Sequence, residues 1–172
     1  MSGVQEGIEA RGVSRDEFLR SYRETVSAVY AYLYRASCGD RPLAEDLTQE
    51  VYAAALVGAR DGDRRVLELA WLRATARNKL VDHFRRVERE RRRVTLIVTS
   101  DEAPAVVSDG VLADRLRKLP PAQRAAIALR YVDDLPVHDV AHALGKSTKA
   151  TESLLSRARE ALRHEPSEDP DD

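Results

Sequence analysis

The segment from Pro136 to His164 most constrains the fold, because two helical patterns follow one another across a short turn. Pro136 suits a first helical position, where its missing N–H would have no partner. Gly145 suits the left-handed conformation that ends a helix, and Ser147 suits the N-cap of the next helix. The second helix carries an inward stripe of Thr151, Leu154, Leu155, Ala158 and Leu162. This spacing predicts a helix-turn-helix, a motif that places its second helix in the DNA major groove, although an ordinary helical hairpin has a similar pattern.

The composition favours helices throughout the chain. Of the 172 residues, 33% are charged and only 5% are aromatic, and no long strand-like alternation appears. The single cysteine, Cys38, excludes an internal disulfide framework and fits a reducing cytoplasm. We expect a cytoplasmic protein without membrane contact, because the sequence shows no signal-peptide pattern and no apolar run of membrane-spanning length.

Charge is unevenly distributed along the chain. Residues 60–93 carry a net charge of +6 (12 basic and 6 acidic residues), and residues 111–164 carry +4 (10 basic and 6 acidic). The segments before, between and after these two blocks are acidic. Two basic blocks are typical of a protein that contacts nucleic acid at two places, although solvated helix faces give a similar bias.

Three helical patterns predict a first domain at residues 14–93. Ser14-Arg15-Asp16-Glu17 forms a capping box at the first helix start, Cys38-Gly39-Asp40 ends that helix, and a basic third helix runs from about Val66 toward Arg92. The apolar positions predicted to form the core are Phe18, Tyr22, Val26, Val29, Tyr30 and Leu33, then Leu43, Leu47, Val51 and Ala54, then Leu67, Trp71, Ala74, Val81 and Phe84.

The remaining sequence predicts a linker at 94–110, a second domain at 111–164 and an acidic disordered tail at 165–172. Within the linker, Thr95 to Val98 fits either a short strand or an apolar segment that contacts a partner. The fold class is therefore expected to be all-α, with two small helical domains joined by a flexible linker and a helix-turn-helix in the second.

Three local signatures resemble the extracytoplasmic-function (ECF) class of bacterial sigma factors, over residues 16–164. They are Ala44-Glu45-Asp46-Leu47-Thr48-Gln49-Glu50-Val51-Tyr52, then Trp71-Leu72-Arg73-Ala74-Thr75-Ala76-Arg77-Asn78 running into Asp82-His83-Phe84-Arg85-Arg86, and Leu119-Pro120-Pro121-Ala122-Gln123-Arg124 leading to Leu155-Ser156-Arg157-Ala158-Arg159. The order of the three is more specific than any one of them. Such a factor binds the RNA polymerase core and directs promoter-specific initiation. Its first domain binds the clamp helices of the largest subunit and recognises the −10 element, and its second binds the flap and reads the −35 element.

The resemblance also implies which residues carry each role. Core-polymerase binding is expected at Glu45, Asp46, Gln49 and Glu50. Contacts with the −10 DNA are expected at Asn78, Lys79, His83, Arg85, Arg86 and Arg64, with Asn78 lining a pocket for an unstacked base and the cations following the phosphates. Contacts with the −35 DNA are expected at Lys149, Glu152, Ser153, Ser156 and Arg157. No cofactor, metal or catalytic residue is expected, because the polymerase supplies the chemistry.

The chain departs from the family pattern at two places. The loop from Arg60 to Leu69 aligns with the family's specificity loop but lacks a Phe-Arg-Gly-like start, so the identity of the base that it captures stays open. In the recognition helix, Glu152 and Leu154 replace two usually basic positions. A glutamate repels phosphates but accepts hydrogen bonds from a cytosine amino group, so we expect −35 reading with an altered base preference. Trp71 is expected in the core rather than as a stacking platform.

Several alternatives stay open at the level of sequence. A helix-turn-helix regulator that acts without polymerase accounts for the second domain but not for the signatures at 44–52 and 71–86. His138 and His142 have metal-ligand spacing, but no third ligand is evident and surface histidines are favoured. Cys38 fits a buried thiol better than a redox sensor. The family makes an anti-sigma factor a candidate partner, and the tail is a candidate weak self-inhibitor on basic surfaces.

Overall fold

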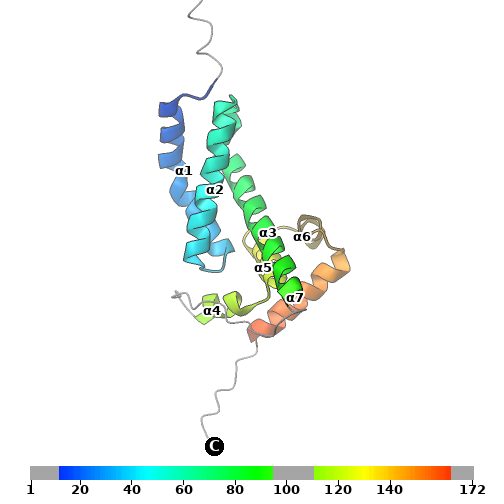
Figure 1. The fold of residues 1–172 in the computed structure, drawn as a ribbon. Coiled ribbons are helices and arrows are strands. Elements are labelled where there is room, and N and C mark those ends of the chain that lie inside the picture. The colour runs from blue at the N-terminus through cyan, green and yellow to red at the C-terminus, as the bar shows by residue number, and fades with distance from the viewer. Residues whose placement is uncertain (1–11, 95–110, 164–172) are drawn as a thin grey trace, which may run out of the picture. The chain divides into compact units, whose positions relative to one another are not determined.

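The computed structural model describes residues 12–94 and 111–163, which form α-helices and one 3₁₀ helix and contain no strand (Figure 1). The all-α expectation is confirmed. The elements in order are α1 (Arg15–Ala36), α2 (Arg41–Arg60), η1 (Arg64–Leu67), α3 (Leu69–Val94), α4 (Val111–Lys118), α5 (Pro121–Tyr131), α6 (Val137–Leu144) and α7 (Thr148–Arg163). In this part of the chain no helix is both long and apolar enough to span a membrane.

The chain divides into two compact units. Among the described residues, the first unit contains those up to Leu33 together with Pro42–Lys79, and the second contains Tyr34–Arg41 and those from Leu80 onward. This division cuts through α1 and α3, so the limits expected at 14–93 and 111–164 stay a prediction. The expected linker beyond Val94, its apolar stretch at 95–98 and the acidic tail at 165–172 lie outside the described residues.

The start of α1 confirms the predicted capping box. The Ser14 N–H donates to Glu17 Oε2 at 3.0 Å, and the Glu17 N–H donates to Ser14 Oγ at 3.2 Å. The predicted break after α1 is also present, because Cys38 and Gly39 adopt φ of 64° and 78°. The Gly39 N–H donates to the Tyr34 carbonyl at 2.8 Å, which closes the last turn.

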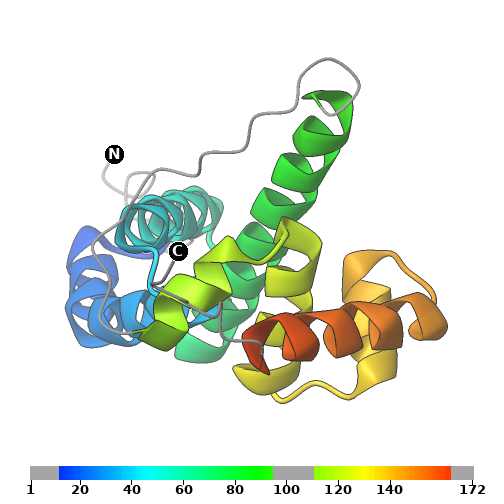
Figure 2. The same cartoon turned by 90° about the horizontal axis from the view of Figure 1, so that it is seen from below.

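In the first unit, α1 and α2 run side by side with the beginning of α3 (Figures 1 and 2). Val29 and Leu33 of α1 and Leu47 and Val51 of α2 are buried as predicted. Tyr22 is 40% exposed, contrary to its place in the predicted core, and its ring packs edge-on against Tyr52 with 4.8 Å between centroids. The buried face of α2 also contains small residues and a tyrosine outside the predicted stripe, namely Ala44, Tyr52, Ala55 and Ala59.

The predicted core positions of the third helix were partly wrong. Ala74 is exposed and Trp71 is half-buried, while Leu72, Ala76 and Leu80 are fully buried. The difference arises because the apolar spacing predicts one helix from about Val66, whereas the chain forms η1 and then restarts as α3 at Leu69. This interruption shifts the buried face of the helix relative to a continuous pattern.

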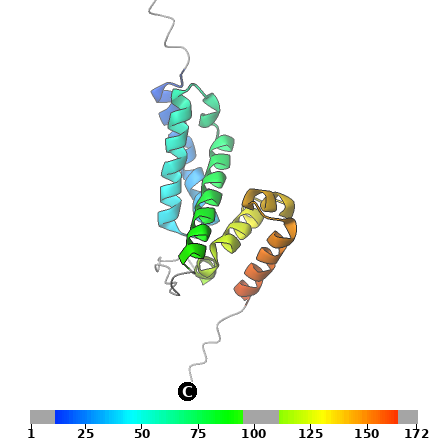
Figure 3. The ribbon, with the colours of Figure 1, turned by 45° about the vertical axis from the view of Figure 1, so that its right-hand side comes forward.

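The helix-turn-helix of the second unit is confirmed. Helices α5, α6 and α7 pack on one another (Figure 3). Gly145 has φ of 61°, its N–H donates to His142 O at 3.0 Å, and the Lys146 N–H donates to Ala141 O at 2.9 Å, which is a Schellman ending. Ser147 Oγ accepts the Ala150 N–H at 3.2 Å and caps α7. Of the predicted inward stripe, Thr151, Leu155 and Ala158 are buried and Leu154 and Leu162 are half-buried.

Candidate functional surfaces

The first candidate surface is an acidic face of α2. Residues one helical turn apart share a side of a helix, so Glu45 lies above Gln49 and Asp46 above Glu50. All four side chains are exposed, whereas Leu47 and Val51 of the same helix are buried. The structure therefore brings together every residue expected to contact the polymerase.

Glu50 also contacts Lys79, a residue expected to bind −10 DNA. Its Oε2 lies 3.1 Å from Nζ of Lys79 on α3, and the two side chains are 48% and 37% exposed. An ion pair this exposed contributes at most about 1 kcal/mol. Sequence reasoning assigned Glu50 to polymerase and Lys79 to DNA and did not anticipate the pair, because it depends on how α2 packs on α3.

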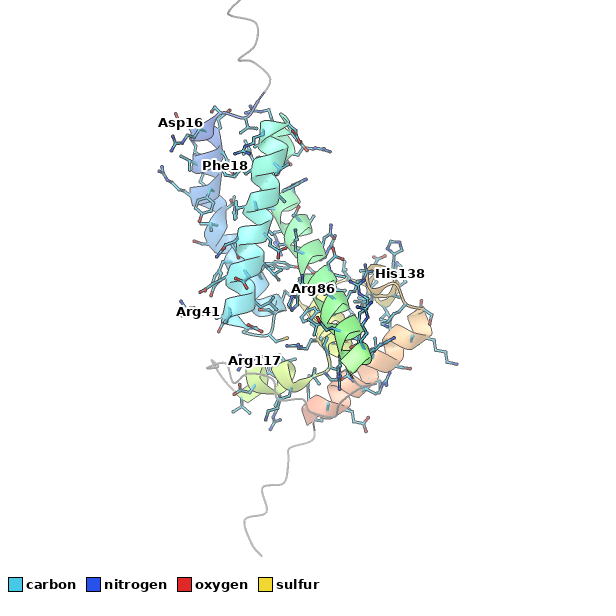
Figure 4. The ribbon with its side chains drawn as sticks, in the orientation of Figure 1. Asp16, Phe18, Arg41, Arg86, Arg117 and His138 are labelled. Atoms are coloured by element: carbon cyan, nitrogen blue, oxygen red, sulfur yellow. The ribbon has the colours of Figure 1, made fainter. Side chains whose placement is uncertain are left out.

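The second candidate surface lies along α3. Asn78, Arg85 and Arg86 are exposed, and Lys79 and His83 are half-buried (Arg86 is labelled in Figure 4). Three of these side chains, Arg85, Arg86 and His83, have partners on the same helix. Arg85 Nη1 lies 3.7 Å from Asp82 Oδ1, and Arg86 Nη2 lies 3.4 Å from His83 Nδ1. The polar groups expected to contact −10 DNA therefore occur on one basic helix, with Arg64 contributed separately by η1.

The segment before α3 is held by side-chain contacts at its start. Asp63 caps η1, because its Oδ1 accepts the Arg65 N–H at 3.1 Å. Its carboxylate also accepts hydrogen bonds from Nε and Nη2 of Arg65, each at 2.9 Å. These side-chain bonds lower the pKa of Asp63 most, and the capping bond lowers it further. This fork directs the Arg65 guanidinium back toward the loop.

Arg64 is engaged within the molecule. Its Nη2 donates to Glu17 Oε1 on α1 at 2.7 Å. The hydrogen bond from Arg64, followed by the bonds from the Ser14 N–H and hydroxyl, lowers the pKa of Glu17 to about 2. One turn further along α1, the Ser21 hydroxyl donates to the Leu67 carbonyl at 2.8 Å. Sequence reasoning found the capping role of Glu17 but not these contacts, whose partners are 46 and 47 residues apart.

The third candidate surface is the outer face of α7. The five residues expected to contact −35 DNA are all exposed, namely Lys149, Glu152, Ser153, Ser156 and Arg157. The Arg157 Nε donates to the Ser153 carbonyl at 3.3 Å, which lays this side chain back along its own helix. The opposite face of α7 is the one that packs on α5 and α6, so the outer face is available to a partner.

Two other groups singled out in the sequence are not among the residues expected to bind polymerase or DNA. His138 and His142 are exposed on α6, and His138 Nε2 lies 3.2 Å from Asp139 Oδ1 (Figure 4). Across residues 12–94 and 111–163 no group of three or more His, Cys, Asp or Glu side chains is arranged to hold a metal ion. Cys38 is 5% exposed, and burial raises the pKa of its thiol to about 11.

Comparison with known proteins matches both parts of the chain. Residues 21–90 match the family described as sigma-70 region 2, and residues 110–162 match sigma-70, region 4. The ECF RNA polymerase sigma factor BldN of Streptomyces coelicolor is 33% identical over 89% of this chain and 61% of its own length. The ECF RNA polymerase sigma factor SigM of Bacillus subtilis is 30% identical over 83% of this chain and 90% of its own length. A solved sigma factor RpoE of Bartonella quintana, in complex with the anti-sigma factor NepR, has a TM-score of 0.48 at 23% identity and covers 86% of this chain and 94% of its own.

Proposed function

Because this chain belongs to the ECF class of RNA polymerase sigma factors, we propose that it binds the RNA polymerase core and directs transcription initiation at promoters with a particular −10 and −35 element. The observation that carries the proposal is that three different helices, α2, α3 and α7, each present a set of exposed or half-buried side chains of the chemical character that its role needs. The α2 set is mainly acidic, the α3 set is basic with one amide, and the α7 set combines two cations and two hydroxyls with the carboxylate of Glu152.

In this proposal the acidic face of α2 binds the clamp helices of the largest polymerase subunit. Glu45, Asp46 and Glu50 meet basic residues there, and complementary charge fixes the register of docking and speeds the encounter. A second contact with the polymerase, at the flap, is assigned to the region expected as the second domain, residues 111–164. We assign no catalytic step and no cofactor to the chain, because the polymerase makes the phosphodiester bonds. The chain then acts where polymerase is, in the cytoplasm.

The basic α3 and the preceding loop take the −10 element. The amide of Asn78 both donates and accepts, so it suits a pocket for an unstacked base, while Lys79, Arg85 and Arg86 neutralise phosphates. The outer face of α7 takes the −35 element in the major groove. An anti-sigma factor stays a candidate partner, proposed from family membership alone.

Binding to purified core polymerase in the absence of DNA tests the proposal most directly. We expect the full chain to bind, and Asp46→Lys to weaken binding about tenfold, because it reverses a charge at the proposed docking face. Asp16→Lys is the matched control, since it reverses an exposed carboxylate on α1 outside that face. A chain that binds DNA site-specifically but not core polymerase would instead be a regulator that acts without it.

The −35 assignment is tested by Glu152→Lys in promoter-specific transcription with reconstituted holoenzyme. The carboxylate repels phosphates and accepts a hydrogen bond from a cytosine amino group. Its replacement by a cation should therefore change the free-energy difference between bases at one −35 position by about 1–3 kcal/mol and raise the affinity for DNA generally. Glu160→Lys, further along α7, is the control for charge alone. If Glu152→Lys leaves both preference and affinity unchanged, Glu152 lies outside the interface.

A further inference from the structure

Two polar side chains of α1 contact the two ends of η1. Glu17 and Ser21 are one helical turn apart, so they project from the same side of α1. Glu17 accepts a hydrogen bond from Arg64, the first residue of η1, at 2.7 Å. Ser21 donates to the carbonyl of Leu67, the last residue of η1, at 2.8 Å. The α1 pair (Glu17 and Ser21) therefore spans the whole of this short helix.

Such support matters because η1 has few restraints of its own. A 3₁₀ segment of four residues has strained hydrogen bonds and little internal stability. Its own restraints are the Asp63 cap, the hydrogen bond from the Glu68 N–H to the Arg65 carbonyl at 2.9 Å, and Val66, which is 2% exposed and packs closely on Gly58. The contacts from α1 add a fixed point at each end, one to a side chain and one to the backbone.

The α1 pair also determines what Arg64 offers to a partner. An arginine side chain on a surface otherwise samples many rotamers and pairs with any nearby phosphate. The Glu17 carboxylate limits that sampling and offsets the charge, while most of the guanidinium donors stay available. An arginine held this way favours one geometry of contact over general attraction to DNA.

We propose that Glu17 and Ser21 are positioning residues that set base selection at the −10 element by holding η1 and Arg64 in one arrangement. The inference rests on the proposed function, in which the loop from Arg60 to Leu69 selects a −10 base. Neither residue contacts DNA in this proposal. Their effect passes through the loop.

The test compares Glu17→Gln and Ser21→Ala with two matched controls, Asp16→Asn and Ser27→Ala, which remove the same groups from exposed positions of α1. The readout is transcription by reconstituted holoenzyme on promoters that differ by single −10 bases. We expect each α1 variant to lower discrimination between the preferred and substituted bases about threefold, with core-polymerase binding unchanged. Glutamine keeps an oxygen that accepts the Ser14 N–H, so the start of α1 is preserved. Unchanged discrimination, or an equal loss in the controls, would overturn the proposal.

Two further measurements separate a positioning role from a structural one. In an Arg64→Ala background, Glu17→Gln should have no additional effect on discrimination, and an additional threefold loss would overturn the route through Arg64. Amide hydrogen exchange in the free chain should be faster at Arg65–Leu67 in both α1 variants than in the controls. Equal exchange would overturn the holding role independently of whether the chain acts in transcription. If the unsubstituted chain supports no promoter-specific transcription, the proposed function fails together with the inference. If it supports such transcription and only discrimination is unaltered, the inference alone fails.

Discussion

The carboxylate of Glu17 has a different partner on each oxygen. Oε2 accepts the Ser14 N–H at the start of α1, and Oε1 accepts the Arg64 guanidinium. The first contact follows from a spacing of three residues and was predicted as a capping box. The second joins residues 47 positions apart and has no local signature. Local hydrogen bonds are visible in a sequence because helix geometry fixes their spacing, whereas bonds between helices depend on packing.

Acid should release both contacts of Glu17 at an unusually low pH. Its pKa of about 2 lies below the usual value of 4.5, so the charged form is favoured by folding. The stabilisation is therefore complete above about pH 4.5 and is lost as the pH falls toward 2. Carbon-13 NMR of the side-chain carboxyl groups should show a midpoint near 2 for Glu17, and Arg64→Ala should raise it. A midpoint near 4.5 in the unsubstituted chain would contradict the ion pair.

Cys38 should react as a buried thiol rather than as a redox sensor. Only the thiolate is nucleophilic, and a pKa of about 11 leaves about one thiolate in 10⁴ at pH 7, in a side chain that is 5% exposed. We expect alkylation by iodoacetamide to be at least about 100-fold slower in the native chain than in the chain unfolded by urea. Equal rates would show that the thiol is accessible, and would reopen the sensor interpretation.

At the scale of elements, the sequence was most informative where backbone chemistry is local. The turn between α6 and α7 was predictable because Gly145 and Ser147 each fit one conformational requirement, a positive φ and an N-cap. The register of α3 was not predictable, because no residue pattern after Val66 indicates that η1 ends at Leu67 and that a new helix begins at Leu69. Tyr22 was wrongly predicted in the core for a related reason. Apolar spacing indicates which side of a helix is apolar, but it does not indicate which neighbouring element covers that side.

The three candidate surfaces show the same limit. Periodicity and family resemblance together placed the exposed residues of α2 and α7 on single faces. They did not reveal which residues of the candidate surfaces pair with residues of other helices. Glu50 with Lys79 and Glu17 with Arg64 are pairs across helices, and each involves a residue assigned to a partner molecule.

The packing of η1 on α2 should be sensitive to one added methyl group. A Cβ on Gly58 would lie 2.7 Å from Cγ1 of Val66, a stiff β-branched side chain that is almost fully buried. Gly58→Ala gains about 1 kcal/mol of helix propensity, but overpacking costs about 1–3 kcal/mol, so we expect a net loss of stability. Chemical denaturation measures the free energy of unfolding. The double variant with Gly58→Ala and Val66→Ala should lose less free energy of unfolding than the sum of the losses in the two single variants. Strict additivity would show that the two side chains do not clash.

At the scale of the whole molecule, the two basic blocks of the sequence fall in the parts that match sigma-70 regions 2 and 4. An almost neutral net charge of −1 thus conceals two separate cationic regions. Under the proposed function, each region reads one promoter element. Their contributions to promoter binding should then be separable by mutation.

Lys79→Ala and Arg157→Ala test this separation, because the two residues belong to different units. Each change should weaken promoter binding of the holoenzyme and reduce by about one the slope of log affinity against log salt concentration. The loss of affinity caused by Lys79→Ala should be as large on promoters with a weakened −35 element as on intact promoters. The loss caused by Arg157→Ala should likewise be as large on promoters with a weakened −10 element. In the double variant the free-energy losses should add to within about 0.5 kcal/mol. A large deviation would show that the two contacts are made together or not at all.

The ion pair between Glu50 and Lys79 has a consequence for genetic dissection of this protein. A reversal of charge at Glu50 does more than alter the polymerase-facing side of α2, because Lys79 Nζ lies 3.1 Å from Glu50 Oε2 and the change replaces this attraction by repulsion between two cations. A selection for second-site suppressors of Glu50→Lys should therefore recover acidic or neutral replacements at Lys79 within the same gene, as well as changes in the polymerase. Asp46 belongs to the same face, and suppressors of Asp46→Lys should not cluster at Lys79.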